Sequence, residues 1–262
     1  MTQNAEVTID SVDNFGEIIA ENADGNDQGG ANAFHIAGIV GFSTATVDTQ
    51  HFVTISDCSN EGNMTSATCR TSGICAAANR RTKMVNCINK GNQLNSCPGP
   101  DKGRIANIAC NVANVSSMTG CVNYGDIIST TSARTAGIAN LSNNCEFSHC
   151  ANYGNVQSDN KNRGLFWAYN NGLASWSSCV AGGTVGTYND GKGVADEYTD
   201  ETKENYLGLQ GANKTTLTDI TYLIGVKDPE PPVESNAKLK ILFIGNSFTK
   251  DAVEHIPGLL AA

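Results

Sequence analysis

The stretch Met118-Thr-Gly-Cys121-Val-Asn123-Tyr-Gly125 carries a signature that recurs along the chain: an apolar residue, two spacers, Cys, one spacer, Asn, one spacer and Gly. Similar copies begin at Ile55, Met84 and Phe147, a copy without Cys begins at Ile9, and a decayed copy begins at Trp176. The cysteines of successive copies are 29 or 34 residues apart. A period of this length is typical of solenoids, in which each repeat forms one coil.

A second signature lies between the copies of the first. It is found at Ala37-Gly38-Ile39, Ser72-Gly73-Ile74, Ala106-Asn107-Ile108, Ala136-Gly137-Ile138, Arg163-Gly164-Leu165 and Lys192-Gly193-Val194. Each repeat therefore holds two short apolar runs, and neither has the spacing of an amphipathic helix. The Asn-x-Gly segment tolerates left-handed backbone and predicts a corner. The pattern predicts an all-β fold, a right-handed parallel β-helix of about six coils, over residues 1–225, with 196–225 as a capping segment.

Equivalent residues of successive coils in such a fold lie about 4.8 Å apart, so the signature residues form rows along the axis. We expect the cysteines to pack inward as small apolar residues, and the asparagines to hydrogen-bond to one another along the axis. Glycine fits where a Cβ would clash. The predicted structural rows are Cys58, Cys87, Cys121, Cys150 and Cys179, and Asn60, Asn89, Asn123 and Asn152.

The disulfide pattern of the ten cysteines stays open at this point. In-register cysteines point the same way, which is poor geometry for a bridge, so we expect free buried thiols in the row. Cys69–Cys75 and Cys145–Cys150 are the candidate pairs. His149 is expected on a solvent-facing strand, and no Cys or His spacing matches a zinc site. The sequence therefore predicts no metal and no cofactor.

Composition argues against several classes of function. The 262 residues include 17 basic and 26 acidic residues, for a net charge of −9. No basic cluster is interleaved with aromatic residues, which argues against a nucleic-acid partner. No apolar run approaches the ~20 residues of a membrane span, and no signal peptide precedes the first repeat. We expect a monomer.

Four aromatic residues gather toward the end of the repeats, at Phe166, Trp167, Tyr169 and Trp176. Two interpretations stay open for them. Trp167, Tyr169 and Trp176 form a platform on which a sugar ring stacks, or the aromatic side chains plug the end of the core.

A boundary follows the repeats. Residues 226–238 contain Asp228-Pro-Glu-Pro-Pro-Val-Glu-Ser, and this proline-rich composition predicts an extended linker. After it, Leu239–Ile244 predicts a buried strand, Gly245-Asn246-Ser247 a tight turn, and Asp251–Ile256 a short helix that Pro257 ends. The sequence thus predicts a short C-terminal β-α fragment at 239–262.

That fragment resembles the first sequence block of the SGNH (GDSL-like) hydrolases, esterases with a three-layer α/β fold. The resemblance implies that Ser247 is the nucleophile and that its backbone N–H contributes to the oxyanion hole. The family's Gly-Asp-Ser is Gly245-Asn246-Ser247 here, and no Asp-x-x-His follows before Ala262. His255 does not match the family's histidine and is expected at the surface. We therefore expect a truncated hydrolase domain without its acid and base partners, and a chain that is catalytically incomplete.

Residues 9–195 resemble the GLUG-type repeats of bacterial surface β-helix proteins, through the Cys-x-Asn-x-Gly segment and the second signature. This resemblance implies a secreted or cell-surface protein of a Gram-negative envelope. The two resemblances together imply an accessory module, glycan-binding or spacer, of an esterase that acts on acylated glycans or similar esters. The implied partner is a polysaccharide or other glycan.

Two alternatives belong to other classes of function. The first is a surface adhesion or binding repeat protein without catalysis. The second is a β-helix polysaccharide lyase or hydrolase, which needs clustered carboxylates, or a basic residue with a metal, along one face. Asp126, Glu146 and Asp159 occupy different repeat positions, so the sequence favours the second alternative least.

Overall fold

The computed structural model describes residues 6–21, 34–45, 51–97, 103–131, 133–170, 172–189, 192–208 and 215–225. The chain divides into two units after Asp228. The predicted linker at 226–238 and the predicted fragment at 239–262 lie outside the described residues, and so does most of the polar insert that follows Glu21.

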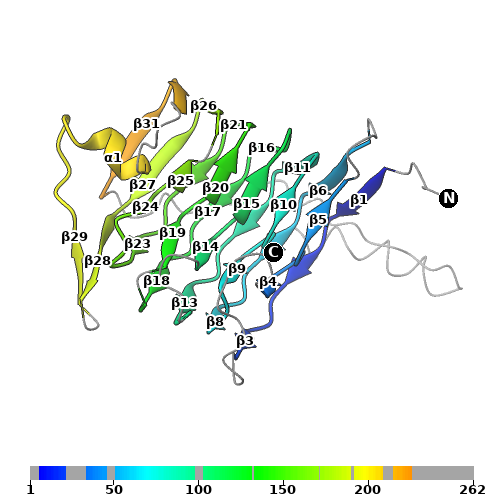
Figure 1. The fold of residues 1–262 in the computed structure, drawn as a ribbon, viewed down its shortest axis with the longest axis horizontal. Helices are drawn as coiled ribbons and strands as arrows, with labels where there is room; N and C mark the ends of the chain where they lie inside the picture. Colours follow the sequence, from blue (N-terminus) through cyan, green and yellow to red (C-terminus); the bar gives the residue numbers. More distant parts are fainter. Residues whose placement is uncertain are drawn as a thin grey trace, which may run out of the picture. The chain divides into compact units, whose positions relative to one another are not determined.

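The described residues form a parallel β-helix, as the repeat pattern predicts. Strands from successive repeats pair side by side in five sheets, and the chain visits the sheets in the same order in each coil (Figure 1). Sheet A contains β1 (Val7–Asp10), β6 (Val53–Ser56), β11 (Thr82–Val85), β16 (Ser117–Thr119), β21 (Cys145–Ser148), β26 (Ala174–Ser177) and β30 (Thr215–Thr218). Sheet B contains β2 (Asp13–Asn14), β7 (Ser59–Asn60), β12 (Ile88–Asn89), β17 (Val122–Asn123), β22 (Ala151–Asn152), β27 (Val180–Gly183) and β31 (Thr221–Ile224).

The other three sheets complete each coil. Sheet C contains β3 (Ile18–Ala20), β8 (Met64–Ser66), β13 (Gln93–Asn95), β18 (Ile127–Ser129), β23 (Val156–Gln157), β28 (Val185–Asn189) and β29 (Lys192–Ala195). Sheet D contains β4 (His35–Ala37), β9 (Arg70–Ser72), β14 (Arg104–Ala106), β19 (Arg134–Ala136) and β24 (Arg163–Gly164). Sheet E contains β5 (Ser43–Thr44), β10 (Ala78–Asn79), β15 (Ala109–Ala113), β20 (Ala139–Asn143) and β25 (Trp167–Asn170). A short helix, α1 (Lys203–Leu207), follows β29.

The register of sheet A shows that each repeat makes one coil. The apolar residue that opens each copy of the signature pairs with its counterpart in the next coil. This inward row is Ile9, Ile55, Met84, Met118, Phe147, Trp176 and Leu217. The strands β30 and β31 pair with β26 and β27 and so extend the stack beyond the last copy of the signature. Part of the segment that was expected to cap the stack therefore begins a seventh turn.

A left-handed corner lies one residue before the cysteine position, in addition to the predicted corner at Asn-x-Gly, where the chain bends from sheet B to sheet C. The corner residues have φ between 50° and 66°, in the left-handed region, and are Ser11, Asp57, Asn86, Gly120, His149, Ser178 and Asp219. The prediction of a strand position for His149 is therefore wrong, although its side chain is exposed. A left-handed residue turns the chain from sheet A into sheet B, and short polar side chains tolerate this conformation best.

The asparagine side chains form a continuous buried column, which confirms the predicted ladder. Each Nδ2 donates to Oδ1 of the asparagine in the next coil, over 2.7 Å from Asn14 to Asn60 and 2.8 Å from Asn60 to Asn89. The next steps are 2.9 Å from Asn89 to Asn123 and 2.7 Å from Asn123 to Asn152. The column ends when Asn152 donates to the carbonyl of Gly182, over 3.2 Å, because the next coil has Ala in the asparagine position.

Glycines pack against this column from two sides. A Cβ added at Gly91 would overlap the carbonyl oxygen of Gly62 in the preceding coil, so the first signature needs glycine for steric reasons. A Cβ added at Gly73 would overlap Oδ1 of Asn89, which shows that the second signature faces the ladder across the interior. Asn107 replaces glycine in one coil, and there its Nδ2 donates to the carbonyl of Gly125 over 2.5 Å.

The last two copies of the second signature do not stack as the sequence predicts. Gly164 pairs with Ala136 and not with Gly137, so the copy at 163–165 is out of alignment by one residue. The copy at 192–194 lies in β29, which forms an antiparallel hairpin with β28. The main chain of Tyr206 and Leu207 takes its place and accepts hydrogen bonds from Leu165 and Phe166.

The cysteine row is buried and free of disulfides, as predicted, but the predicted disulfide pairs are not formed. Cys69 and Cys97 form the disulfide, with 5.2 Å between their Cα atoms. The two proposed pairs, Cys69–Cys75 and Cys145–Cys150, are therefore wrong. The free and buried thiols are Cys58, Cys75, Cys87, Cys110, Cys121, Cys145, Cys150 and Cys179.

We predict that Asn123→Ala lowers the free energy of unfolding by about 3 kcal/mol or more, because several buried groups lose their partners and each unsatisfied group costs ~1–3 kcal/mol. Asn123 accepts from Asn89 and from the N–H of Gly125, and donates to Asn152 and to the carbonyl of Gly125. Urea unfolding followed by circular dichroism measures the loss. Asn14→Ala is the matched control at the open end of the column, and equal losses for the two variants would contradict a cooperative ladder.

Candidate functional site

Ser247, the nucleophile implied by the resemblance, lies outside the described residues, and so does its backbone N–H. The geometry of an esterase site is therefore not part of the described structure. The candidate sites that can be built from the described residues are the aromatic cluster, two surface cavities, the contacts of Arg163 and a row of three other arginines.

The aromatic residues fill the core at the end of the stack. Two of the three residues predicted as a platform for a sugar ring are therefore inside the protein and not on its surface. Trp167 and Trp176 are fully buried. The ring of Trp176 stacks on Phe147, with 3.8 Å between centroids and an interplanar angle of 3°, and on Phe166 at 4.8 Å. Neither indole offers a face to a sugar. Tyr169 is half-buried, and the guanidinium of Arg134 lies 4.8 Å from its ring centroid.

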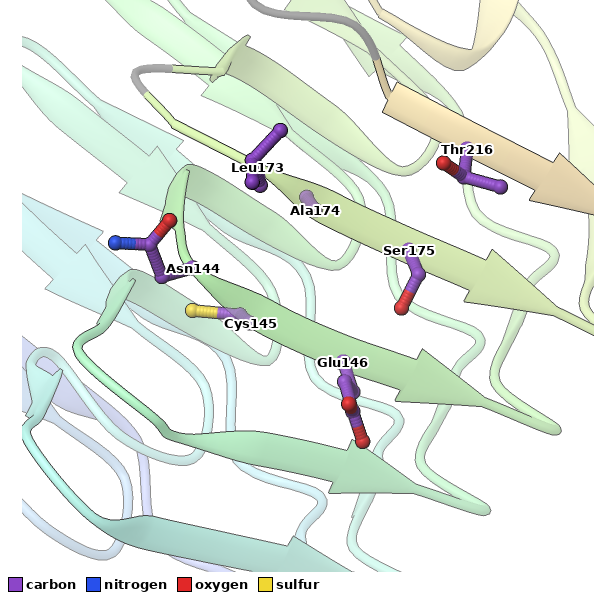
Figure 2. A pocket seen from close by; sticks show the side chains of 7 residues that line it. All are labelled: Asn144, Cys145, Glu146, Leu173, Ala174, Ser175 and Thr216. Carbon is purple, nitrogen blue, oxygen red and sulfur yellow. The ribbon is translucent and has the colours of Figure 1, made fainter.

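A shallow cavity of about 320 Å³ lies over sheet A (Figure 2). Its lining is Asn144, Cys145, Glu146, Leu173, Ala174, Ser175 and Thr216. Figure 2 shows Glu146 and Ser175 on the neighbouring strands β21 and β26. Glu146 is the one carboxylate of the lining, and the Cys145 thiol donates inward to the carbonyl of Val112 over 3.0 Å. This cavity holds no pair of groups for acid and base catalysis.

A second cavity, of about 330 Å³, lies over sheet C, where a polar row runs along β8, β13 and β18. In this row Oδ1 of Asn92 accepts from the N–H of Asp126, and Oδ1 of Asp126 accepts from the N–H and the Nδ2 of Asn155. The carboxylate of Asp126 is thus engaged in a second, outer ladder between coils. Within the described ranges, no three His, Cys, Asp or Glu side chains gather as metal ligands.

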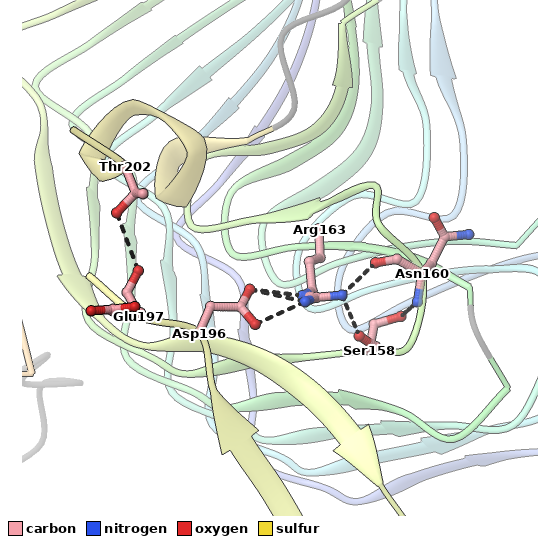
Figure 3. Close-up of polar contacts among 6 residues, drawn as sticks. All are labelled: Ser158, Asn160, Arg163, Asp196, Glu197 and Thr202. Carbon is pink, nitrogen blue, oxygen red and sulfur yellow. Dashed lines mark hydrogen bonds and ion pairs between the residues drawn. The ribbon is translucent and has the colours of Figure 1, made fainter. Parts of the chain in front are cut away.

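Arg163, on β24, binds Asp196, the first residue after β29 (Figure 3). Its Nη2 donates to both carboxylate oxygens of Asp196 at 2.9 Å, and its Nη1 donates to the carbonyls of Ser158 and Asn160 at 3.1 Å. A guanidinium with this many partners fixes the chain after β29 against sheet D. We assign Arg163 a structural role for that reason.

Three other arginines form a row along sheet D. Arg70, Arg104 and Arg134 pair in register on β9, β14 and β19, and His35 precedes them on β4. The residue after each arginine points inward, as shown by Ile105 in the main core, so the arginines point outward. All three are half-buried. Successive members of the row lie about one inter-strand spacing, ~4.8 Å, apart.

The row concentrates positive charge. Burial, followed by the charges of Arg70 and Arg134, holds the pKa of Arg104 below its usual value. The ion pairs found within the described part of the chain are Lys90–Glu61, Arg163–Asp196 and Lys203–Asp200. No carboxylate among the described residues therefore lies within salt-bridge distance of Arg104 or Arg134.

Sheet E meets the arginine row at Tyr169, whose ring lies under the guanidinium of Arg134. Asn111, Leu141 and Tyr169 pair in register on β15, β20 and β25. Oδ1 of Asn111 and Nε of Arg134 are buried without a hydrogen-bond partner, so these two atoms are closed to an external ligand.

The sequence contains a signal for this row. Arg70, Arg104 and Arg134 each stand three residues before the Gly or Asn of the second signature. They repeat with the same period as the structural residues. They occupy an outward position, which distinguishes them from the Cys, Asn and Gly rows that fill the interior.

Two of the buried thiols, Cys75 and Cys110, are not candidate nucleophiles. Cys75 and Cys110 are fully buried, and burial raises the pKa of each thiol to about 12. The thiolate is the reactive form, so these thiols stay protonated and unreactive in the folded protein at neutral pH.

No family model, curated protein or solved structure matches this chain. No helix in the described part of the chain is long and apolar enough to span a membrane. The assignment of function therefore depends on the geometry above and on the sequence motifs.

We predict that stability falls above pH 9 and that Cys75 contributes to the fall. Its pKa is higher in the folded state than in the unfolded state, so its contribution is complete below the unfolded value and is lost as the pH rises toward 12. In Cys75→Ala the free energy of unfolding should decrease less steeply with pH, by about 1.4 kcal/mol per pH unit between roughly pH 9 and 11. Urea unfolding at several pH values tests this, with Ser117→Ala as control. An unchanged slope in Cys75→Ala would contradict it.

Proposed function

We propose that the β-helix is a non-catalytic module that binds a glycan or acts as a spacer in a secreted or cell-surface esterase of the SGNH type. The side chains at the inward positions of the coils support a role without catalysis for the β-helix. These positions are filled by apolar side chains and by the asparagine column. Such a stack is a rigid scaffold whose outer rows remain available for contact with a ligand.

The carboxylates support a binding module over a lyase or hydrolase built on the β-helix. Asp126 lies beside sheet C and is engaged by Asn155, whereas Glu146 lies on the outside of sheet A. Glycoside hydrolysis needs two carboxyl groups on either side of one bond, within about 10 Å of each other. Asp126 and Glu146 instead stand over two different cavities of the described structure.

The esterase part of the proposal depends on the motif at Gly245-Asn246-Ser247 and on the apolar segment before it. In this proposal Ser247 attacks the ester carbonyl and its N–H stabilises the oxyanion. The general base and the residue that orients it come from a longer product of the gene. The β-helix then holds the acylated glycan near that site.

The test measures ester hydrolysis by the longest product of the gene that contains this chain. We expect hydrolysis of p-nitrophenyl acetate and release of acetate from acetylated glycans, both lost in Ser247→Ala. The rate should fall by about 10⁴-fold or more, because removal of a nucleophile leaves only residual catalysis.

Ser178→Ala, at a left-handed corner of the β-helix, is the control and should keep full activity. The 262-residue chain alone should hydrolyse neither substrate faster than its own Ser247→Ala variant. Equal activity of the long product with and without Ser247 would remove the esterase from the proposal and leave the binding or spacer role to be tested separately.

A further inference from the structure

The row of Arg70, Arg104 and Arg134 places three guanidinium groups on adjacent strands, of which Arg70 contacts the His35 ring and Arg134 contacts the Tyr169 ring. Three guanidinium groups on adjacent strands repel one another, and partial burial weakens the solvent screening that reduces this repulsion. The chain carries more acidic than basic residues, 26 against 17, yet places no carboxylate within salt-bridge distance of Arg104 or Arg134 among the described residues. Arg163 shows the contrasting arrangement, since Asp196 neutralises it directly.

The surroundings of the row define the chemistry of its ligand. The guanidiniums supply forked donors that match the two oxygens of a carboxylate. The half-buried ring of Tyr169 lies beside Arg134. A chain-like ligand with several carboxylates matches three guanidinium groups on adjacent strands.

We propose that Arg70, Arg104 and Arg134 bind the carboxylates of an acidic glycan that lies along the β-helix axis, across the coils. This inference rests on the proposed binding module and gives it a ligand class. The row runs along the axis, so an extended chain contacts one arginine per coil.

A nucleic acid fits these observations less well. The net charge of −9 opposes the approach of a long phosphate backbone. Among the described residues, the Tyr169 ring is covered by Arg134 and the His35 ring contacts Arg70, so the row offers no series of open rings on which successive bases stack. Single-stranded DNA therefore belongs in the experiment as a competing ligand.

The experiment is calorimetric titration of the 262-residue chain with a galacturonate oligosaccharide. The comparison ligands are the same oligosaccharide with methyl-esterified carboxyl groups, sodium sulfate, and single-stranded DNA. We expect the acidic oligosaccharide to bind, with an affinity that falls as salt is added, and the methyl ester to bind at least about tenfold more weakly, because it lacks the charge that the arginines bind.

The variants are Arg104→Gln, Arg104→Lys and the control Arg80→Gln, which removes one charge from an exposed corner. Arg104→Gln should weaken binding on the order of tenfold to a hundredfold, the range expected for a lost hydrogen bond to a charged group. Arg104→Lys keeps the charge but lacks the fork and should weaken binding less. Arg80→Gln should leave the affinity unchanged within about twofold, since it stands outside the row.

A second measurement separates a binding role from a structural one. Without ligand, Arg104→Met keeps the apolar stem and removes the repulsion within the row, so its melting temperature should equal or exceed that of the unsubstituted chain. A large decrease of the melting temperature in Arg104→Met, together with unchanged glycan affinity in Arg104→Lys and Arg104→Gln, would show that the row stabilises the fold. That result would overturn the inference.

The other outcomes are also distinct. Equal binding of the acidic oligosaccharide and its methyl ester would overturn the inference and keep a glycan-binding module. Tighter Arg104-dependent binding of DNA, or Arg104-dependent binding of sulfate alone, would replace the ligand class. No binding of any ligand would overturn the inference and reduce the proposed function to a spacer.

Discussion

The column of asparagine side chains is the interaction on which the rest of the structure depends. An amide has a donor and an acceptor at opposite sides, so one asparagine per coil can bond to its neighbours above and below without a break. In the buried interior an unsatisfied amide is costly, and any coil that slips in register leaves two of them. The column also explains the glycines, since Gly62 and Gly91 lie so close that a Cβ would clash, and Gly73 makes room for the amide of Asn89.

A scaffold that is fixed from within leaves its outer rows free to vary, and this is where function is expected. The outward positions of sheet A carry hydroxyl groups and scattered charges, whereas sheet D repeats arginine in three successive coils. Repetition gives an extended ligand equivalent contacts at equal spacing. In the proposed esterase, the same regularity makes the β-helix a stiff connector to the catalytic domain. Binding and spacing are therefore two uses of one property, and neither requires reactive groups within the coils.

The sequence predicted the coils, the asparagine column and the free thiols of the signature, because each depends on a residue type that recurs with a fixed period. It predicted the corner at Asn-x-Gly but not the left-handed corner before the cysteine, since Ser, Asp, Asn, Gly and His all occur at that position. The disulfide Cys69–Cys97 joins neighbouring coils through residues that have no equivalents in other repeats. Burial of Trp167 and Trp176 follows from register, which a count of aromatic residues does not show. The arginine row was not predicted, because Arg70, Arg104 and Arg134 lie outside the interior whose residues define the two signatures.

Distances between coils test the central claim most directly. Spin labels at Thr54 and at Glu146, Ser175 or Thr216 occupy the same outward row of sheet A, three, four and five coils apart. Pulsed electron resonance should give distances that increase by about 4.8 Å for each added coil, the spacing of hydrogen-bonded strands. A set of distances without this linear increase, in a folded protein, would contradict a stack of coils held in register by the asparagine column.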